Sequence, residues 1–391
     1  MLYCTMEALF MVHKRAWAEI NLANLTYNLK TLQKHLLHQP SSLMGIVKAD
    51  AYGHGAIPVA KTLFNNGVKS FGVAICEEGI ELRQGGIHAP ILVMGFTPDQ
   101  LLTEVVYHDL TQTVFHKDGA TALASCAARV NKRAAIHIKI DTGMSRLGFL
   151  PSLESIETIC NIAAIPHLEV TGIYTHLATS DAINNDFMFE QLERFKWVTN
   201  EIEKRGVTIP VKHIANSGAF SHMTATKTDS YKDFYQDHVR LGIMMYGYPP
   251  SLEMASTCAP LNLKPVMRLI SRVSMVKNLP ANVGISYGHL YKTKKESTIA
   301  VLPIGYADGY PRRLSNGGKV LINGKLAPIA GAICMDQCMV DVTGIDNISP
   351  GDPVIMMGEA GICADNLAEI VGTISYEILC GVGKRMPRVY V

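Results

Sequence analysis

The sequence has no excess of charge of either sign and no long apolar run. Its 391 residues include 36 Lys and Arg against 34 Asp and Glu, for a formal net charge of +2. No basic stretch with interleaved aromatic residues is present, which argues against nucleic acid as a partner. No run of 18 apolar residues occurs, so we expect no membrane span, and residues 1–14 lack the features of a secretory signal. A small molecule is therefore the expected substrate.

The sequence also lacks the paired cysteines of a zinc site. Its nine cysteines are odd in number and irregularly spaced, and none forms a C-x-x-C pair. Cys334 and Cys338 lie four apart in a stretch that we read as a strand, but two thiols on one face do not make a zinc site. We expect no metal, and free thiols in the reducing cytoplasm.

Short apolar runs alternate with amphipathic stretches between about residues 40 and 250. Eight such runs predict a parallel sheet covered on both faces, and their number predicts a (β/α)8 barrel of the TIM type. A doubly wound open sheet is the alternative, weakened because no G-x-G-x-x-G follows the first run. The runs are Leu43–Lys48, Ser70–Ile75, Ile91–Gly95, Leu110–Phe115, Ala135–Asp141, Leu168–His176, Val211–Asn216 and Val239–Tyr246. The clearest helical stretches between them are Glu77–Gln84, Gly119–Arg129, Leu153–Ala164 and Asn185–Arg205.

The pattern changes after Pro250, where helical periodicity fades. We predict a barrel domain over residues 15–250 and a mostly β domain over residues 251–391. Asn323-Gly324 predicts a hairpin, because both residues accept a positive φ. The expected strands are Val266–Lys277, Ser297–Ile304, Lys319–Ile322, Lys325–Val342 and Pro353–Met357, with one helix at Asp365–Val371.

Lys48 is the most informative residue of the barrel region. It ends the apolar run from Leu43, and the loop expected after it supplies Tyr52 and His54. A lysine desolvated in apolar surroundings has a lowered pKa and can act as a Schiff-base nucleophile. The alternative is an ordinary strand-end lysine that extends to solvent.

Other polar residues fall at the ends of later strands, where barrel enzymes carry their active sites. Asn216 and Ser217 form either an ordinary helix cap or a phosphate site at a helix N-terminus. A buried Arg240 must have an acceptor. Lys139 alternates with isoleucines, so it would face the barrel interior, while His176 alone is more typical of a satisfied core histidine. A lysine nucleophile together with an anion site is what a pyridoxal phosphate enzyme needs.

Several separated motifs resemble those of the alanine racemases. The resemblance covers the chain from about Arg15 to Val391. The barrel motifs are Val47-Lys-Ala-Asp-Ala-Tyr-Gly-His-Gly55, Lys139-Ile-Asp-Thr-Gly-Met-Ser-Arg146, Tyr174-Thr-His176, Asn216-Ser217 and Arg240-Leu-Gly-Ile243. The later ones are Ile285-Ser-Tyr-Gly288, Ile304-Gly-Tyr-Ala-Asp-Gly-Tyr310, Cys334-Met-Asp336 and Ser375-Tyr-Glu377.

This resemblance implies interconversion of L-alanine and D-alanine with pyridoxal 5'-phosphate as cofactor. Lys48 binds the cofactor and serves as one proton-transfer base, and Tyr287 is the other. The implied cofactor contacts are Tyr52, His176, Asn216, Ser217, Arg240, Gly242, Ile243 and Tyr376. Arg146, Met335 and Tyr306 are the implied substrate contacts, and Lys139 is the expected carbamylated lysine.

The resemblance further implies a homodimer, because Tyr287 and Met335 come from the partner subunit in this family. It also implies that a strand from residues 1–20 can join the β domain. The expected role is to supply D-alanine for peptidoglycan. Two alternatives stay open. One is another racemase or a decarboxylase of the same fold, although the glycine-rich loop and late cysteine motif of the decarboxylases are missing here. The other is a non-catalytic pyridoxal phosphate-binding protein, which would lack the β domain.

Overall fold

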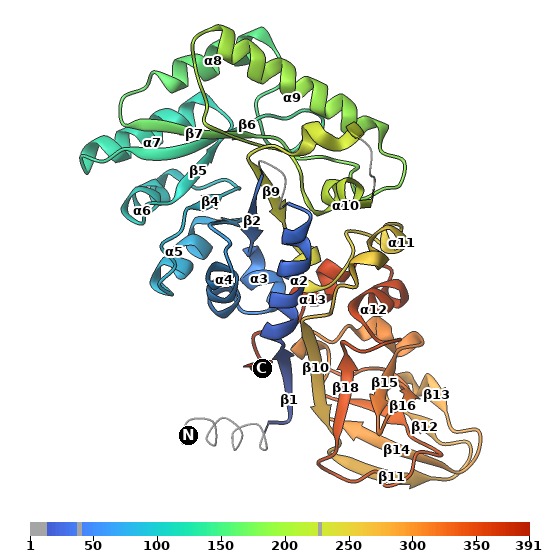
Figure 1. Ribbon diagram of the computed structural model, residues 1–391. Helices are drawn as coiled ribbons and strands as arrows, with labels where there is room; N and C mark the ends of the chain where they lie inside the picture. Colours follow the sequence, from blue (N-terminus) through green and yellow to red (C-terminus); the bar gives the residue numbers. More distant parts are fainter. Residues whose placement is uncertain (1–13, 37–40, 226–228) are drawn as a thin grey trace. The chain divides into compact units, whose positions relative to one another are not determined.

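The eight apolar runs form a closed parallel barrel. The computed structural model describes residues 14–36, 41–225 and 229–391, and it divides into two compact units. The barrel unit comprises Leu25–Ala51 and Gly55–Lys264. Its strands, in barrel order, are β2 (Ser42–Ile46), β3 (Ser70–Val73), β4 (Ile91–Val93), β5 (Thr111–Val114), β6 (Ala134–Lys139), β7 (Leu168–Tyr174), β8 (Val211–His213) and β9 (His238–Leu241). The predicted barrel is thus confirmed (Figure 1).

Helices follow the strands, as the alternating pattern predicted. The four predicted helices correspond to α5 (Cys76–Gln84), α7 (Lys117–Arg129), α8 (Leu153–Ala163) and α9 (Asp186–Lys204). Ser152 precedes α8 and its side chain accepts the amide of Ser155, an ordinary N-cap. The other helices of this part of the chain are α2 (Leu22–Lys34), α3 (Lys48–Gly53), α4 (Ala56–Asn65), α6 (Leu102–Tyr107), α10 (Ser217–Ala225) and α11 (Ala255–Cys258).

Several barrel strands end earlier than the predicted runs, and two of these differences change the structure around predicted site residues. The run Leu43–Lys48 leaves the barrel after Ile46, and Lys48 begins α3 instead of ending a strand. The run Val239–Tyr246 leaves it after Leu241, and Ile243–Tyr246 forms the 3-10 helix η3. Buried apolar residues continue past both strands, at Val47 and at Ile243–Tyr246, so the apolar run does not mark where either strand ends.

The second unit is built on a six-stranded sheet. Its order is β16-β15-β18-β10-β1-β19, formed by β16 (Lys325–Pro328), β15 (Lys319–Ile322), β18 (Pro353–Met357), β10 (Met267–Arg272), β1 (Ala16–Ile20) and β19 (Arg388–Tyr390). Strand β1 therefore pairs with strands more than 240 residues away in sequence. The rest of the expectation for residues 1–20 lies outside the described residues.

Smaller sheets complete this unit. One has the order β11-β14-β17, formed by β11 (Met275–Leu279), β14 (Ser297–Leu302) and β17 (Cys338–Asp341), and another pairs β12 (Gly284–Ile285) with β13 (Tyr291–Lys292). Helices α12 (Ala364–Val371) and α13 (Ser375–Cys380) lie near its end in sequence. The mostly β expectation for this region is confirmed.

In the β domain, the predicted hairpin is present, but one predicted strand is divided by a loop. Asn323 and Gly324 both have positive φ values, 48° and 74°, and connect β15 to β16 as predicted. The run Lys325–Val342 was read as one strand, which is wrong, because a loop separates β16 from β17. Cys334 lies in that loop while Cys338 begins β17, so the two do not share a strand face.

Two simple expectations concern the whole chain. Every cysteine that the structure describes is a free thiol. Among these residues, no helix combines the length and the apolar character needed to cross a membrane.

Candidate active site

A belt of polar side chains crosses the interior of the barrel. Lys139, Tyr174, His213 and His238 are register neighbours on four consecutive strands, β6 to β9. The rings of Tyr174 and His213 are stacked, with centroids 4.6 Å apart and planes inclined by 6°. Polar groups in this position need partners, because burial without hydrogen bonds is costly.

The amine of Lys139 has no hydrogen-bond partner among the described residues. Its side chain is buried, and Nζ lies 4.5 Å from the centroid of the Tyr174 ring. Desolvation, together with the charges of Arg240 and Arg146, moves the pKa of Lys139 well below its usual value. The neutral amine is therefore far more accessible here than for a surface lysine. The expectation that Lys139 faces inward agrees with this burial.

Arg240 has the acceptors that its burial demands. Its guanidinium donates to Nδ1 of His213 at 2.8 Å and to the carbonyl oxygens of Thr175 and Ile214 at 2.8 and 3.0 Å. A longer contact of 3.4 Å reaches Nδ1 of His176. Burial lowers the pKa of Arg240 to about 10, which still leaves it charged at neutral pH.

The histidines around Arg240 are held in the neutral form. Desolvation lowers the pKa values of His176 and His213 well below the usual value, and the charge of Arg240 lowers them further. Burial likewise lowers the pKa of His137 to about 3. The charge of Lys48 also contributes to the shift at His176, so the structure brings Lys48 toward the same strand ends.

A helix start and a 3-10 helix start form a polar cradle at the last two strands. Asn216 caps α10, since its side chain accepts the amide of Ala219 at 3.0 Å. The buried hydroxyl of Ser217 accepts the amide of Gly242 at 3.1 Å, which ties the start of α10 to the start of η3 at Ile243. First-turn amides at such positions are available to an anion. The ordinary capping role of Asn216 and an anion site at Ser217 are compatible.

Lys48 opens an unusual piece of backbone. Residues Ala49, Asp50, Ala51 and Tyr52 have φ values of 53°, 53°, 52° and 55°, so α3 is a left-handed turn. Each such non-glycine residue costs roughly 1–2 kcal/mol relative to the right-handed conformation. Strain of this kind is retained where the surrounding structure enforces it, and it is concentrated at functional sites.

The loop after β6 carries Arg146 and is folded around one carboxylate. Asp141 accepts the amides of Gly143 and Ser145 through Oδ1, at 3.0 and 2.9 Å, and the amide of Arg146 through Oδ2 at 3.1 Å. The side chain of Arg146 is exposed. Asp141 therefore fixes the backbone from which Arg146 extends.

Two tyrosines lie close together in the second unit. The rings of Tyr52 and Tyr376 have centroids 5.9 Å apart, and Tyr376 belongs to α13. Burial raises the pKa of Tyr52, so its hydroxyl keeps its proton and can donate. Gly53 is required beside it, because φ is +79° and a Cβ there would lie 2.4 Å from the carbonyl oxygen of Leu379.

Tyr287, Tyr306 and Met335 lie on connected segments of the same unit. The amides of Tyr306 and Ala307 donate to the carbonyl oxygens of Cys334 and Met335, at 3.1 and 3.0 Å. The hydroxyl of Ser286 donates to the carbonyl of Ala332 at 2.6 Å, which joins the Tyr287 segment to the same loop. All three predicted side chains are exposed, Tyr287 to 72%.

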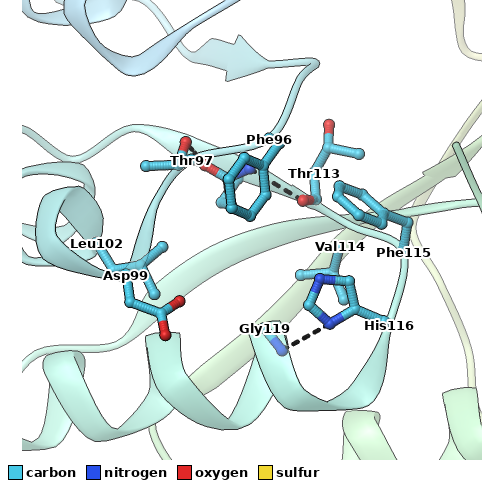
Figure 2. Close-up of a pocket in the computed structure, with 10 residues that line it drawn as sticks. Phe96, Thr97, Asp99, Leu102, Thr113, Val114, Phe115, His116 and Gly119 are labelled. Atoms are coloured by element: carbon cyan, nitrogen blue, oxygen red, sulfur yellow. Dashed lines mark hydrogen bonds between the residues drawn. The ribbon is translucent and has the colours of Figure 1, made fainter.

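A small cavity beside β4 and β5 contains none of the predicted site residues. It measures about 30 Å³, enough for about one water molecule, and lies between Phe96, Thr97, Gln112 and His116 (Figure 2). The side chain of His116 accepts the amide of Gly119 and so caps α7. His116 therefore has a structural role beside this cavity.

Sequence reasoning missed two of the histidines in the hydrogen-bond chain that starts at Arg240. His213 was not selected, nor was His137, whose Nδ1 lies 2.9 Å from Nε2 of His213. A signal was present, since His137 is two residues before Lys139 on β6 and so faces the same interior. Gly172 accommodates it, because a Cβ at that position would lie 2.5 Å from the His137 ring.

The barrel has the parts that a pyridoxal phosphate-dependent enzyme needs. A lysine follows its first strand, a helix start is suited to phosphate, and an arginine is buried at the last strand. Comparison with known proteins agrees. Residues 20–250 match the family model for the alanine racemase N-terminal domain, and residues 266–390 match that for the C-terminal domain. The chain belongs to the alanine racemase family of pyridoxal phosphate-dependent enzymes.

The similarity to individual relatives extends over nearly the whole chain. The alanine racemase of Clostridium novyi (strain NT) is 46% identical over 379 residues, which cover 96% of this chain and 95% of the relative. A solved alanine racemase of Clostridium difficile 630 matches with a TM-score of 0.92 at 39% identity, over 97% of this chain and 96% of that one. The Bartonella henselae alanine racemase, solved with covalently bound pyridoxal phosphate, matches with a TM-score of 0.84 at 30% identity, over 97% and 100%.

Proposed function

We propose that the protein interconverts L-alanine and D-alanine with Lys48 and Tyr287 as the two bases. The observation that supports this most strongly is the setting of Arg240. Its hydrogen-bond partners are carbonyl oxygens and neutral imidazoles, and none of those recorded is a carboxylate. An arginine in this setting stays charged and cannot give a proton to a cofactor ring, which suits proton transfer at Cα better than transamination.

The residues present fit pyridoxal phosphate. Ser217 would provide a hydroxyl donor and Ile243 an amide donor at two helix starts, where Gly242 donates its own amide to Ser217. Tyr52 and Tyr376 would provide two more hydroxyls for the phosphate. Lys48 would bind the aldehyde, and Arg240 would face the ring nitrogen with His176 and Asn216 beside the ring. When bound, the cofactor withdraws electrons from Cα of the amino acid and so makes its proton removable.

Two bases are needed because racemisation removes a proton from one face of Cα and returns one to the other. The amine of Lys48 serves one face, and the hydroxyl of Tyr287 serves the opposite face. Each group must hold the proton in one direction of reaction and release it in the other. The neutral His176 beside Arg240 supports this role, because it can orient the tyrosine hydroxyl without adding a positive charge.

We further propose a homodimer in which Tyr287, Tyr306 and Met335 complete the active site of the partner subunit. The three are exposed to 72, 42 and 53%, respectively. Exposed aromatic and methionine side chains on connected loops are typical of an interface. Tyr306 would line the entrance, and the backbone of Met335 would meet the substrate carboxylate.

Arg146 would pair with that carboxylate, and a carbamylated Lys139 would orient Arg146. A buried amine with a lowered pKa and no hydrogen-bond partner among the described residues is a suitable site for carbamylation. The modification would replace a positive charge, repelled by Arg146 and Arg240, with a negative one.

The proposed location is the cytoplasm, and the proposed role is the supply of D-alanine for peptidoglycan. The purified protein, supplied with D-alanine, is expected to form L-alanine, measured by chiral chromatography, without release of carbon dioxide. Lys48→Ala should abolish both turnover and the absorbance of covalently bound cofactor. Carbon dioxide release would indicate a decarboxylase instead, and full turnover by Lys48→Ala would overturn the proposal.

A further inference from the structure

The left-handed turn that begins at Lys48 is held at its exit by its own residues. The amide of Gly55 donates to the carbonyl of Asp50 at 2.9 Å, and the amide of Ala56 donates to Oδ1 of Asp50 at 2.7 Å. These bonds close the turn onto the start of α4. None of these bonds involves the first residues of the turn, next to Lys48.

The entry is held by a carboxylate from another element. Oε1 of Glu78 accepts the amide of Ala49 at 2.6 Å, from a residue 29 positions away in sequence. Its other oxygen, Oε2, accepts the amide of Ala74 at 2.7 Å and that of Ile75 at 3.4 Å. One side chain therefore connects the end of β3, the start of α5 and the residue directly after Lys48.

Helix capping accounts for only half of this arrangement. Glu78 is at the third position of α5, from which a glutamate commonly reaches back to the amide before the helix. That role requires one oxygen and the amides of Ala74 and Ile75. It does not account for the short bond to Ala49 through the second oxygen. A carboxylate that accepts several amides forms charge-assisted bonds, which are stronger than neutral ones.

We propose that Glu78 is a positioning residue that holds the left-handed turn in place and thereby fixes where the Lys48 side chain starts. This inference rests on the proposed role of Lys48. Without the bond to Ala49, four consecutive residues with positive φ would lose the contact that holds the beginning of their strained conformation. The amine of Lys48 would then sample positions unsuited to bonding and to proton transfer, which depend on placement within about 1 Å.

The test compares Glu78→Gln with Glu77→Gln in the holoenzyme. Glutamine keeps the size of the side chain but offers one acceptor oxygen in place of two. Glu77 precedes it on the same first turn of α5, is exposed, and serves as the matched control. Amide hydrogen exchange followed by mass spectrometry should show residues 48–56 exchanging about tenfold faster or more in Glu78→Gln. We expect kcat to fall about 10- to 100-fold with a nearly unchanged KM for alanine.

Borohydride trapping separates this proposal from the proposed function. Wild type and Glu77→Gln should be trapped with cofactor on Lys48, and Glu78→Gln to a smaller extent at equal total cofactor. Normal exchange of residues 48–56 and normal trapping in Glu78→Gln, even with a lowered melting temperature, would reduce Glu78 to a helix cap and overturn the proposal. Absence of trapping on Lys48 in the wild type would instead contradict the proposed function.

Discussion

Arg240 donates a hydrogen bond to Nδ1 of His213 across 2.8 Å in the barrel interior. Because a guanidinium only donates, Nδ1 of His213 must accept, and the proton of this neutral ring is on Nε2. Nε2 lies 2.9 Å from Nδ1 of His137, which must accept in turn. The charged arginine thus sets the direction of a hydrogen-bond chain of neutral imidazoles.

Replacing Arg240 by an acid should change the balance of reactions. An arginine leaves the cofactor's ring nitrogen unprotonated, whereas the carboxyl group of Arg240→Glu would protonate it and strengthen electron withdrawal. Racemisation should fall about 100-fold or more, and half-transamination per racemisation event should rise. The ratio is measured by the appearance of pyruvate and of the amine form of the cofactor. Arg240→Lys keeps the positive charge and should stay near the wild-type ratio, and an unchanged ratio in Arg240→Glu would remove this explanation.

The buried histidines predict how stability depends on pH. The pKa of His137 is about 3 in the folded protein and about 6.5 in the unfolded chain. Between these values the unfolded chain binds more protons, so the stability present above pH 6.5 is lost as the pH falls toward 3. Each such histidine contributes a slope of about 1.4 kcal/mol per pH unit to the free energy of unfolding. His137→Gln should reduce the pH dependence of the free energy of unfolding by this amount, measured by urea unfolding between pH 6.5 and 5.

His88→Gln is the control for that experiment, because His88 is exposed on the surface. Its slope should equal that of the wild type. A wild-type slope in His137→Gln as well would mean that His137 is not held neutral by burial.

Lys139 should determine substrate affinity through its carbamate. Lys139→Ala removes the negative charge that would orient Arg146, so KM for alanine should rise about tenfold, and added acetate, which can occupy the vacated space, should restore part of it. Carbon-13 NMR with labelled bicarbonate should detect the modified lysine in the wild type. Lys117→Ala, at an exposed lysine, should change neither quantity. Wild-type KM in Lys139→Ala, or no carbamate signal, would contradict the role.

The strands of the barrel could be predicted from the sequence because their signal is local. Runs such as Ser70–Ile75 and Ile91–Gly95 are apolar without alternation, and each contains a barrel strand. The hairpin at Asn323-Gly324 was equally accessible, since only a few residue types favour positive φ at both positions.

The geometry around Lys48 could not be predicted in this way. Nothing in Ala49-Asp50-Ala51-Tyr52 favours a left-handed turn, and glycine would be the expected residue at each position. The turn depends on Glu78, which lies 29 residues beyond Ala49 and contacts it only in the folded barrel. For the same reason the hydrogen bond between His213 and Arg240 became visible only after the strands were placed.

Lys48 and Tyr287 are proposed to act on opposite faces of Cα. Racemisation in heavy water, started separately from L-alanine and from D-alanine, distinguishes two bases from one when wild type is compared with Tyr287→Phe. We predict that Tyr287→Phe loses deuterium incorporation into one enantiomer while Lys48 continues to exchange the Cα proton of the other. Equal loss of exchange from both enantiomers would contradict the assignment of two bases.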